Sequence, residues 1–587
     1  MTLIASRWVP AGSGAGAEES LLHRVQASRP EPADARAREI LHHHTPERAL
    51  RLLHLPRTLP GATAVATRLE AAVRAGRRVA IYGDYDADGI TATAVLWRVI
   101  RAASPGADLV PYVPDRFEEG YGLNAAALHQ LAADGVQVVV TVDCGASAVA
   151  EARLARDLGL ELLVTDHHHV DAGGVAEADA IAHPALPGHE HAPFAELCGA
   201  AVAFKVASEF ARIWCGGERV ADVLRDAVAS TLPLVAVGTV ADVMPLVDEN
   251  RIFVAAGLGI MPSTRIAGLS ALLRDSQLGN GQRVDASDVG FRLGPRLNAV
   301  GRLGHAREAV ELLLTEDPVR VREIVARLAE LNERRRELDR QAFAQACERI
   351  DADPALADAG AIVMADARWH EGVVGIVAAK IAERHGRPAI LMSIRDDGTA
   401  KGSGRSVDGV DMLATVRASC ADLIQRGGGH AHAVGLTVRV DDVPEFARRF
   451  ADACAAATGG MPIGPVHRYD AEARSQEMTS GAVKALQVLR PFGRGNPAPV
   501  FLLRGAVPVA PPAYFGRDRR HVEFTLPGPE RPGGVRAVWW GGADRVGMIR
   551  QGVPVDLLVR PGIDSYRGLG RVQLEVIDVR AVQAPLR

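Results

Sequence analysis

The sequence predicts an α/β protein in which two α/β domains are joined by a long helix and followed by an all-β barrel. Three observations support this fold class. Short apolar runs alternate with segments of helical apolar spacing from about residue 51 to 255 and again from 355 to 460, as βαβ units require. A long, highly charged helical segment follows Pro318. Beyond about residue 465, short β-branched runs are separated by Pro and Gly, a pattern typical of a barrel.

Three predicted strands of the first domain end at acidic residues. Each strand is a short apolar run, and the segment after the first has helical spacing from Gly89 onward. The acidic residues therefore lie in loops after parallel strands, and such loops converge at one edge of the sheet, where α/β folds place their sites. The strands and the residues that follow them are Val79–Tyr82 with Asp84, Asp86 and Asp88, Val136–Val142 with Asp143, and Leu160–Thr165 with Asp166, His167 and His168.

Two later segments extend this series. The apolar run Val235–Ala241 ends at Asp242, and three glycines, Gly427–Gly429, precede His430. Any one of these motifs alone fits a helix cap or a polar loop equally well. The ordered set is different, because clustered carboxylates suit hard divalent cations and imidazole narrows the choice toward manganese, iron or zinc. We therefore expect a metal site at this sheet edge.

The pattern predicts two ions rather than one. The three aspartates of the first loop alternate in sequence, so they can face two different metals. Asp143 is the natural bridging carboxylate, and His167 and Asp242 can complete the shell of the second ion. Two ions about 3.5–4 Å apart clamp a phosphoryl group and activate a water molecule near neutral pH. The chemistry implied is phosphoester hydrolysis.

A long helix and a second α/β domain follow the first domain. The helix has Leu328, Leu331 and Leu338 on one apolar side and mixed charge elsewhere, which favours a solvated spacer between domains over a DNA-binding helix. The runs Ala361–Ala365 and Pro388–Ser393 are predicted strands of the second domain.

Two glycine-rich segments of the second domain suit a phosphate ligand. Gly402–Ser406 is predicted as a loop whose N–H groups and Arg405 guanidinium fit a phosphate. Gly427–His430 has the flexibility to approach a backbone phosphate closely. For either motif alone a glycine-rich turn without a ligand is the alternative. The expected phosphodiesterase site beside them favours the phosphate.

The C-terminal region predicts a small barrel. Its β-branched runs suit a barrel of the OB type, which binds single strands by base stacking and a basic groove. Its aromatic side chains are candidates for stacking, although for any single one a core role is the more common. The runs are Val500–Leu503, His521–Leu526, Val535–Trp540, Val555–Val559 and Val572–Ile577, and the aromatic residues are Tyr514, Phe515, Trp539, Trp540 and Tyr566.

Composition indicates a soluble, cytoplasmic protein. The chain has 587 residues, 48% of them apolar, and a net charge of −4, which leaves room for three or four domains and excludes a globally basic surface. No apolar stretch reaches about 18 residues, and the N-terminus lacks a signal pattern. The six cysteines include no Cys-x-x-Cys pair, which argues against structural zinc and a disulfide framework. We expect residues 1–50 to form an arm packed on the first domain, and His42–His44 to be a polar loop.

These motifs together resemble the DHH phosphoesterase superfamily and, within it, the RecJ branch of single-strand-specific exonucleases that degrade DNA from the 5′ end. The tripeptide Asp166-His167-His168 marks the superfamily, and the Val-Asp-Cys-Gly segment at 142–145 precedes it. The similarity runs from about Val79 to the C-terminus. The segments that narrow the resemblance to the RecJ branch are Pro114–Gly122, Gly294–Arg302, Trp369–Gly375, Gly402–Ser406, Gly427–His430 and Pro491–Pro497.

The resemblance implies a role for each matching residue. The implied ligands of one manganese ion are Asp84 and Asp86 with Asp143, and those of the other are Asp88, Asp143, His167 and Asp242; magnesium is the alternative metal. The implied catalytic residues are His168, at the scissile phosphate, with Asp143 and Asp166. The implied phosphate-binding residues are Arg116, Ser403 and Arg405 at the 5′ end, with Arg296, Asn298 and His430. Two departures leave roles open, because His169 extends the histidine run and His183 stands where the family often has asparagine.

The resemblance also implies a domain plan and partners. The expected order is an arm at 1–50, a DHH catalytic domain at 51–255, a helical connector at 256–350, a DHHA1-type substrate-binding domain at 351–460 and an OB-fold domain at 461–587. The expected partners are single-stranded DNA, a single-strand-binding protein and a RecQ-type helicase, without a membrane, in DNA repair and recombination.

Two rival functions fit the sequence less well. A DHH phosphodiesterase for cyclic dinucleotides or very short RNAs generally lacks the barrel that residues 465–587 predict. A catalytically inactive scaffold, like the replication-helicase relative of this family, requires lost ligands, and the expected ligands are all present.

Overall fold

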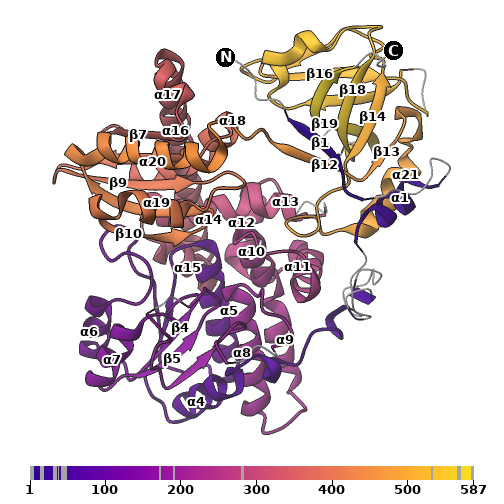
Figure 1. Ribbon diagram of the computed structural model, residues 1–587. Helices are drawn as coiled ribbons and strands as arrows, with labels where there is room; N and C mark the ends of the chain where they lie inside the picture. The colour runs from indigo at the N-terminus through magenta and orange to yellow at the C-terminus, as the bar shows by residue number, and fades with distance from the viewer. Residues whose placement is uncertain are drawn as a thin grey trace. The chain divides into compact units, whose positions relative to one another are not determined.

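The computed structural model describes residues 6–12, 19–30, 36, 39–40, 49–170, 173–188, 192–278, 283–529, 533–564 and 570–582. The chain forms two compact units. Unit 1 comprises Met1–Arg7, Leu55–Asp242 and Gly257–Pro465, and unit 2 comprises Trp8–His54, Val243–Ala256 and Val466–Arg587 (Figure 1). The run His42–His44 and the candidate stacking residue Tyr566 lie outside the described residues.

A parallel five-stranded sheet forms the centre of the first half of unit 1, as the sequence predicts. Its strand order is β3-β2-β4-β5-β6. The β-branched runs are buried on both faces, which is typical of a parallel sheet covered by helices. The strands are β2 (Val79–Gly83), β3 (Leu109–Tyr112), β4 (Val138–Val142), β5 (Glu161–Thr165) and β6 (Ala180–Ala182).

Helices cover both faces of this sheet. One face packs against α6 (Ala125–Ala133) and α7 (Val149–Asp157), and the other against α4 (Ala62–Arg74), α5 (Ala87–Ala103) and α8 (Gly199–Trp214) (Figure 1). The remaining helices up to the long connecting helix are α9 (Asp222–Ser230), α10 (Leu232–Ala241), α11 (Asp248–Ile260), α12 (Ala267–Asp275), α13 (Ala286–Asp288), the π-helix η3 (Val289–Leu293), α14 (Gly294–Leu303) and α15 (Arg307–Leu314).

One helical stretch in the described part of the chain, Asp222–Ala241, is long and apolar enough to cross a membrane, and one bent helix pair passes the same test. Of the apolar window in Asp222–Ala241, 56% is buried inside the protein, and α10 packs on α5 and α8. This burial is that of a core helix.

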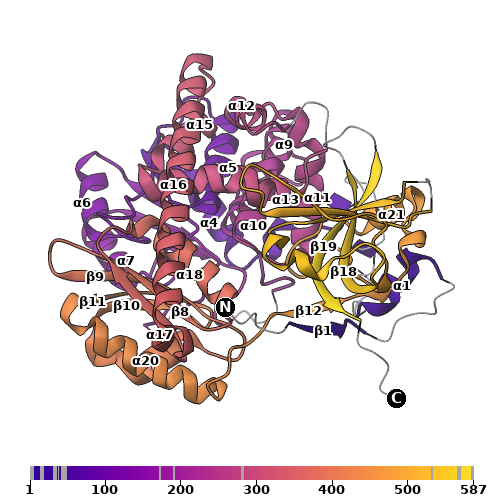
Figure 2. The same ribbon diagram turned by 90° about the horizontal axis from the view of Figure 1, so that it is seen from above.

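The long helix α16 (Pro318–Ala352) runs from α14 to the second sheet (Figure 2). Leu328 and Leu331 are buried and Leu338 is half-buried, so its apolar side is a packing face. Its far end packs against α18 (Glu371–His385). The helix therefore joins the two α/β parts of unit 1 by packing on both.

The second sheet has the order β10-β11-β9-β8-β7, with β7 and β8 parallel and the other pairs antiparallel. The predicted strands near 361–365 and 388–393 are confirmed. The expectation of a loop at Gly402–Ser406 is wrong for Gly402–Arg405, which lie in β9. Gly427–His430 lies in the edge strand β10. The elements are α17 (Pro354–Asp358), β7 (Ile362–Asp366), β8 (Ala389–Ile394), β9 (Thr399–Arg405), α19 (Met412–Cys420), β10 (Ile424–His430), β11 (Ala433–Arg439) and α20 (Val443–Thr458).

Unit 2 is built on a seven-stranded sheet of order β13-β14-β18-β19-β17-β16-β15. All five predicted strands are present, and their alternate side chains form one apolar core. The elements are β12 (Val466–Tyr469), β13 (Ala471–Glu472), α21 (Ser480–Ala485), β14 (Phe501–Ala506), β15 (Ala513–Phe515), β16 (His521–Leu526), β17 (Val535–Trp539), β18 (Val555–Asp564) and β19 (Arg571–Ala581).

The described part of the N-terminal arm from Trp8 onward belongs to unit 2, where its first part packs on the barrel, while Arg36 and Ile40 contact Asp248 and Ile252 of the predicted first domain. Strand β1 (Arg7–Pro10) pairs with β12, and α1 (Leu21–Ser28) buries Leu21 and Val25 in the barrel core. The Arg29 guanidinium donates to Asp470. No local pattern in the sequence indicates this docking, because the apolar face of α1 is only two turns long.

Candidate metal centre and phosphate pocket

The turn from β2 into α5 presents the first acidic residues. Asp86 is the N-cap of α5, and its Oδ1 accepts from the N–H groups of Asp88 at 2.9 Å and Gly89 at 3.2 Å. A Cβ at position 89 would lie 2.6 Å from the Asp84 backbone, so only glycine fits this turn. The helix cap thus fixes the directions of the Asp84 and Asp86 side chains at the carboxyl edge of the sheet.

Asp143 follows β4 in a left-handed backbone conformation with φ of 66°. Such a conformation costs about 1–3 kcal/mol for a residue with a side chain and clusters at functional sites. Its N–H donates to the Thr165 carbonyl at 3.0 Å, which ties the end of β4 to the end of β5. A Cβ on Gly199 would lie 2.5 Å from the Asp143 side chain, so α8 approaches this carboxylate as closely as its backbone allows.

The N-terminus of α8 holds the carboxylate of Asp88. Its two oxygens accept from the N–H groups of Gly199 at 2.6 Å and Ala200 at 2.9 Å. A helix N-terminus favours an anion at this position. A Cβ on Gly238 would lie 2.3 Å from Asp88 Oδ1, so α10 also needs a glycine here.

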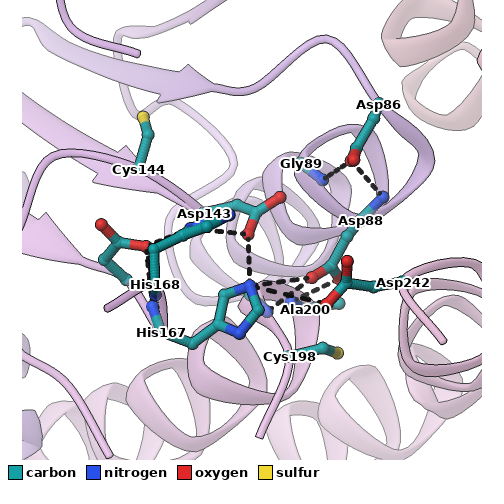
Figure 3. Close-up of polar contacts among 12 residues, drawn as sticks. Asp86, Asp88, Gly89, Asp143, Cys144, His167, His168, Cys198, Ala200 and Asp242 are labelled. Atoms are coloured by element: carbon teal, nitrogen blue, oxygen red, sulfur yellow. Dashed lines mark hydrogen bonds and ion pairs between the residues drawn. The ribbon is translucent and has the colours of Figure 1, made fainter. Parts of the chain in front are cut away.

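His167 lies at the centre of the acidic group (Figure 3). Its Nε2 is 3.1 Å from Asp143 Oδ1, 3.7 Å from Asp242 Oδ2 and 3.8 Å from Asp88 Oδ2. Asp242 reaches this point from the C-terminal end of α10, which is a helix rather than a strand. The fold therefore brings the ends of three strands and the helices α5, α8 and α10 to one point.

Three overlapping groups of side chains offer ligand atoms within 4.8 Å of one another. In the described part of the chain, three buried atoms of these groups have no hydrogen-bond partner: Asp84 Oδ1, Asp143 Oδ1 and His167 Nε2. Unpaired buried polar atoms are rare and costly in folded proteins. The groups are Asp84, Asp86 and Asp143; Asp88, His167 and Asp242; and Asp143, His167 and His168.

The pKa values of these side chains are shifted because the side chains are buried together with no cation among them. Burial, and then the charge of Asp86, raises the pKa of Asp88 to about 6. Burial and the neighbouring carboxylates also raise the pKa values of Asp84 and Asp143. Burial lowers the pKa of His167 to about 3, so its ring is neutral as a metal ligand must be. Unpaired oxygens and a neutral imidazole fit divalent metal ions, which supply the missing positive charge.

Asp166 has a different position from the other aspartates. Its Oδ1 accepts from the N–H groups of His167 and His168 and lies 2.8 Å from Nδ1 of the His168 ring, while Oδ2 accepts from Ala146. Burial opposes ionisation of Asp166, but the bond with His168 lowers its pKa to about 2. Burial likewise opposes the charge of His168, and Asp166 raises its pKa to about 9. Asp166 therefore positions His168 rather than joining a metal group.

His183 holds the same loop from beneath. Its Nε2 lies 2.8 Å from the His168 carbonyl oxygen, and its Nδ1 accepts from the Ala185 N–H at 3.0 Å. The ring must then be neutral, with its proton on Nε2. The neighbouring His169 is exposed.

A cluster of guanidinium groups lies beside the metal groups within unit 1. Arg116 lies over the Tyr85 ring, 4.9 Å from its centroid, and Arg405 on β9 donates to the Ser403 hydroxyl at 3.1 Å. Burial, followed by the charges of Arg116, Arg335 and Arg405, lowers the pKa of Arg302 to about 10. Burial and Arg116 also lower the pKa of Arg405. Positive charges that are close together and partly buried repel one another, and a bound anion would relieve this repulsion. The cluster is therefore a candidate anion site.

Three other predicted phosphate residues differ in position. The Arg296 side chain donates to Asp275 and to the Arg292 carbonyl, and Asn298 Oδ1 accepts from the Ala87 N–H at 2.7 Å. The hydrogen-bonding groups of both side chains are thus used in contacts within the chain. Arg296 and Asn298 therefore support the structure around the site. His430 on β10 lies near enough to Arg405 for its charge to lower the pKa of His430, after burial and His432.

Sequence reasoning missed Arg302 and Tyr121. Arg302 is the last residue of the segment 294–302, and its guanidinium donates to the Gly372 carbonyl at 2.9 Å. The Tyr121 hydroxyl lies 3.1 Å from Nδ1 of His168. The only sequence signal was their place in the segments 294–302 and 114–122.

The barrel separates its two adjacent tryptophans. Trp539 is 5% exposed and lies in the core, so its predicted stacking role is wrong, whereas Trp540 is 52% exposed. Trp540 packs edge to face on Phe515 and His521, which are tilted against each other, and the ring centroids are 5.0–5.3 Å apart. Tyr514 is 43% exposed, and the Arg519 guanidinium lies 5.5 Å from its ring centroid. The candidate stacking surface is therefore Tyr514, Phe515 and Trp540.

Comparison with protein families divides the chain in the same order. Residues 78–239 match the DHH family, N-terminal domain; residues 358–456 match the DHHA1 domain; and residues 469–578 match the RecJ OB domain.

Individual relatives cover most of the chain. A relative from Dickeya dadantii named single-stranded-DNA-specific exonuclease RecJ is 38% identical, over 78% of this chain and 80% of its own length. The relative of that name from Bacillus subtilis is 36% identical over 80% of this chain, but the match spans only 57% of its length. The crystal structure of RecJ from Thermus thermophilus in complex with Mn²⁺ matches with a TM-score of 0.74 and 31% identity, over 90% of this chain and 72% of that one. The corresponding Mg²⁺ complex matches with a TM-score of 0.67 and 30% identity, over 89% and 70%.

Proposed function

Because the chain belongs to the RecJ family of DHH phosphoesterases, we propose that it is a metal-dependent exonuclease that hydrolyses single-stranded DNA from the 5′ end and releases nucleotides. The observation that carries this proposal is the pairing of two structures in unit 1. A cluster of carboxylates, in which Asp84 Oδ1 and Asp143 Oδ1 have no hydrogen-bond partner among the described residues, lies beside a cluster of guanidinium groups. The first suits hydrolysis of a phosphodiester, and the second suits recognition of a phosphate end.

Two divalent ions are the proposed cofactors. Asp84, Asp86 and Asp143 would hold one ion, and Asp88, His167 and Asp242 would hold the other with Asp143 as the bridge. When bound, the ions supply Lewis-acid stabilisation of the phosphoryl oxygens and acidify water. The imidazole in an otherwise carboxylate set favours manganese over magnesium.

The side chain proposed to contact the scissile phosphate is His168. Asp166 keeps its ring charged at neutral pH, because the pKa of His168 is raised to about 9. A fixed imidazolium stabilises the negative charge that develops on the phosphoryl oxygens. His183 and Asp166 hold this ring and its backbone in place from two sides.

The proposed polarity comes from the guanidinium cluster. A terminal phosphate monoester carries more charge than an internal diester, so Arg116, Arg405 and Arg302 with Ser403 can distinguish an end from an interior position. A single strand that begins in this pocket places its first phosphodiester bonds toward the carboxylates. This order gives cleavage from the 5′ end.

The barrel is the proposed grip on the rest of the strand. Residues 466–587 carry 18 Lys and Arg against 11 Asp and Glu, although the whole chain has a net charge of −4. The exposed rings of Tyr514 and Trp540 offer faces to bases, with Arg519 beside them. Four further expectations stay predictions. They are the partners, namely a single-strand-binding protein and a RecQ-type helicase, a role in DNA repair, a cytoplasmic location, and the bounds of the five expected domains.

The rival functions have less support. The match to a RecJ OB domain disfavours a short-substrate phosphodiesterase, and the intact ligand groups disfavour an inactive scaffold.

The deciding experiment is digestion of end-labelled single strands and duplexes by the full chain with manganese, magnesium or a chelator. We expect mononucleotides from the 5′ end of single strands, faster with manganese, and none with the chelator. Release from the 3′ end, or equal degradation of duplex, would contradict the proposal.

A further inference from the structure

The loop between β3 and α6, residues 113–124, touches both halves of the proposed site. Its Arg116 guanidinium lies over the ring of Tyr85, which stands between two of the candidate ligands in the sequence. Its Tyr121 hydroxyl lies 3.1 Å from Nδ1 of His168. The position of this one loop therefore sets the positions of two side chains at the site.

One carboxylate, that of Glu119, organises the loop. Its Oε1 accepts from the Tyr112 hydroxyl at 2.6 Å and from the Asn124 amide at 3.3 Å. Its Oε2 accepts from the backbone N–H of Asp115 at 2.6 Å. All three donors are uncharged, so these bonds join the two ends of the loop rather than balance a cation.

The network around Glu119 is anchored in the sheet. The Tyr112 ring stacks on Tyr82 with centroids 5.0 Å apart. The Tyr82 hydroxyl donates to the Gly122 carbonyl at 2.9 Å and accepts from Asn124 at 3.0 Å. Tyr82 is fully buried in β2, two residues before Asp84. Glu119 thus connects the loop to the strand that carries the first candidate metal ligand.

We propose that Glu119 is a positioning residue that holds Arg116 against the 5′-terminal phosphate and so sets the preference for 5′-phosphorylated strands. This inference rests on the proposed function, and it adds a residue that itself touches neither metal groups nor the arginine cluster. Its neighbour Glu118 is exposed, and in the described part of the chain its side chain has no hydrogen bond or ion pair. The two adjacent glutamates therefore form a matched pair for a test.

The test compares E119Q with E118Q in the full chain with manganese, on single strands with a 5′ phosphate or a 5′ hydroxyl. Glutamine keeps the size of the side chain, but its NH₂ group cannot accept a hydrogen bond. At least one of the donors that now bind the carboxylate would therefore lose its acceptor. We expect the ratio of kcat/KM for 5′-phosphate over 5′-hydroxyl strands to fall about five- to tenfold in E119Q and to stay unchanged in E118Q. Y112F, which removes one donor and keeps the ring, should lower the ratio less.

A cycle with R116A separates positioning from general damage. If Glu119 acts through Arg116, E119Q should change the ratio little in the R116A background. A loss of activity in E119Q that is equal for both end groups, or a ratio like that of wild type, would overturn the inference. A wild-type enzyme that cleaves single strands without preferring a 5′ phosphate would instead overturn the proposed end recognition itself.

Discussion

Two carboxylates with the same burial differ in their hydrogen-bond partners and in their backbone conformation. Asp143 in unit 1 and Asp578 in unit 2 are each 2% exposed. Asp578 accepts from the Trp8 indole at 2.8 Å, from Arg545 at 2.8 Å and from the Val579 N–H at 2.9 Å. Among the described residues, Asp143 Oδ1 has no hydrogen-bond partner, and the Asp143 backbone is left-handed. Burial alone therefore does not mark a functional residue, and what distinguishes Asp143 is a buried oxygen without a hydrogen-bond donor inside a cluster of other carboxylates.

The difference has an energetic meaning. A buried carboxylate with three donors ties elements together, and in the barrel Asp578 joins β1, β19 and the 3-10 helix Gly542–Met548 that bears Arg545. A buried carboxylate surrounded by other carboxylates destabilises the fold until a cation binds, which is why the pKa of Asp143 is raised by burial and by Asp88. In unit 1 this unfavourable free energy is concentrated at one edge of the parallel sheet. In the barrel core, most of the described polar residues have hydrogen-bond partners.

The largest expected effect comes from removing the unpaired carboxylate. Asp143→Ala should lower turnover of single strands about a thousandfold or more, because both ions lose their shared ligand. Binding of single strands should remain measurable, since the arginine cluster and the barrel are intact. Asp578→Asn is the matched control, equal in burial, and its turnover per folded molecule should stay near wild type. Substantial turnover by Asp143→Ala in manganese would remove the bridging assignment.

The next effect separates the metal groups from the arginine cluster. Arg405→Ala should lower kcat/KM about ten- to a hundredfold on strands with a 5′ phosphate, because a charge-assisted hydrogen bond contributes about 1.5–3 kcal/mol. The loss should shrink on strands with a 5′ hydroxyl, where the partner of the guanidinium is absent. Kinetics of wild type and variant on both ends form the measurement, and strictly additive effects would show that Arg405 does not read the terminal phosphate.

The strands that precede the acidic residues could be predicted from the sequence. The segments that the fold packs beside them were harder to predict. Each acidic residue follows a β-branched run that local periodicity identifies, so Asp84, Asp143 and Asp166 could be placed at one sheet edge. Gly402–Arg405 could not be predicted as a strand, because its glycines carry no strand preference and its geometry comes from pairing with β8 and β11.

Residue roles were harder to predict than elements. Trp539 ends β17 and Trp540 lies in the turn that follows, and the sequence alone did not say which of the two faced the core. Arg302 was missed for a related reason. Its neighbours Arg116 and Arg405 come from distant segments, and only the folded chain brings them together.

A smaller effect follows from the pKa of Asp88, which burial and Asp86 raise to about 6. A metal ion must displace the proton that this carboxyl holds below that pH, so apparent manganese affinity should fall about tenfold for each pH unit below about 6. His167, with its pKa lowered to about 3, releases no proton in this range. Calorimetry in two buffers that differ in ionisation enthalpy counts the protons released. Affinity that stays constant between pH 7 and pH 5 would contradict the raised pKa of the buried Asp88 carboxyl.

The last expected effect concerns the barrel and changes binding rather than cleavage. Trp540→Ala should weaken binding of long single strands by about 1–3 kcal/mol, the contribution of one stacked base, and leave the cleavage of short oligonucleotides unchanged. Trp539→Ala, in the core, should instead lower the thermal stability of the chain. Fluorescence anisotropy with strands of increasing length measures the first effect. Equal affinity of Trp540→Ala and wild type for a long strand would remove this surface from substrate binding.

The two-ion centre is tested most directly by the number of manganese ions that the full chain binds, measured by titration calorimetry on the metal-free protein. We expect two ions per chain for wild type and for Asp578→Asn, and loss of tight binding at both sites in Asp143→Ala. Manganese should also raise the melting temperature of wild type, since the ions bind the folded state alone. A single ion per chain, or two ions bound unchanged by Asp143→Ala, would contradict a centre bridged by this carboxylate.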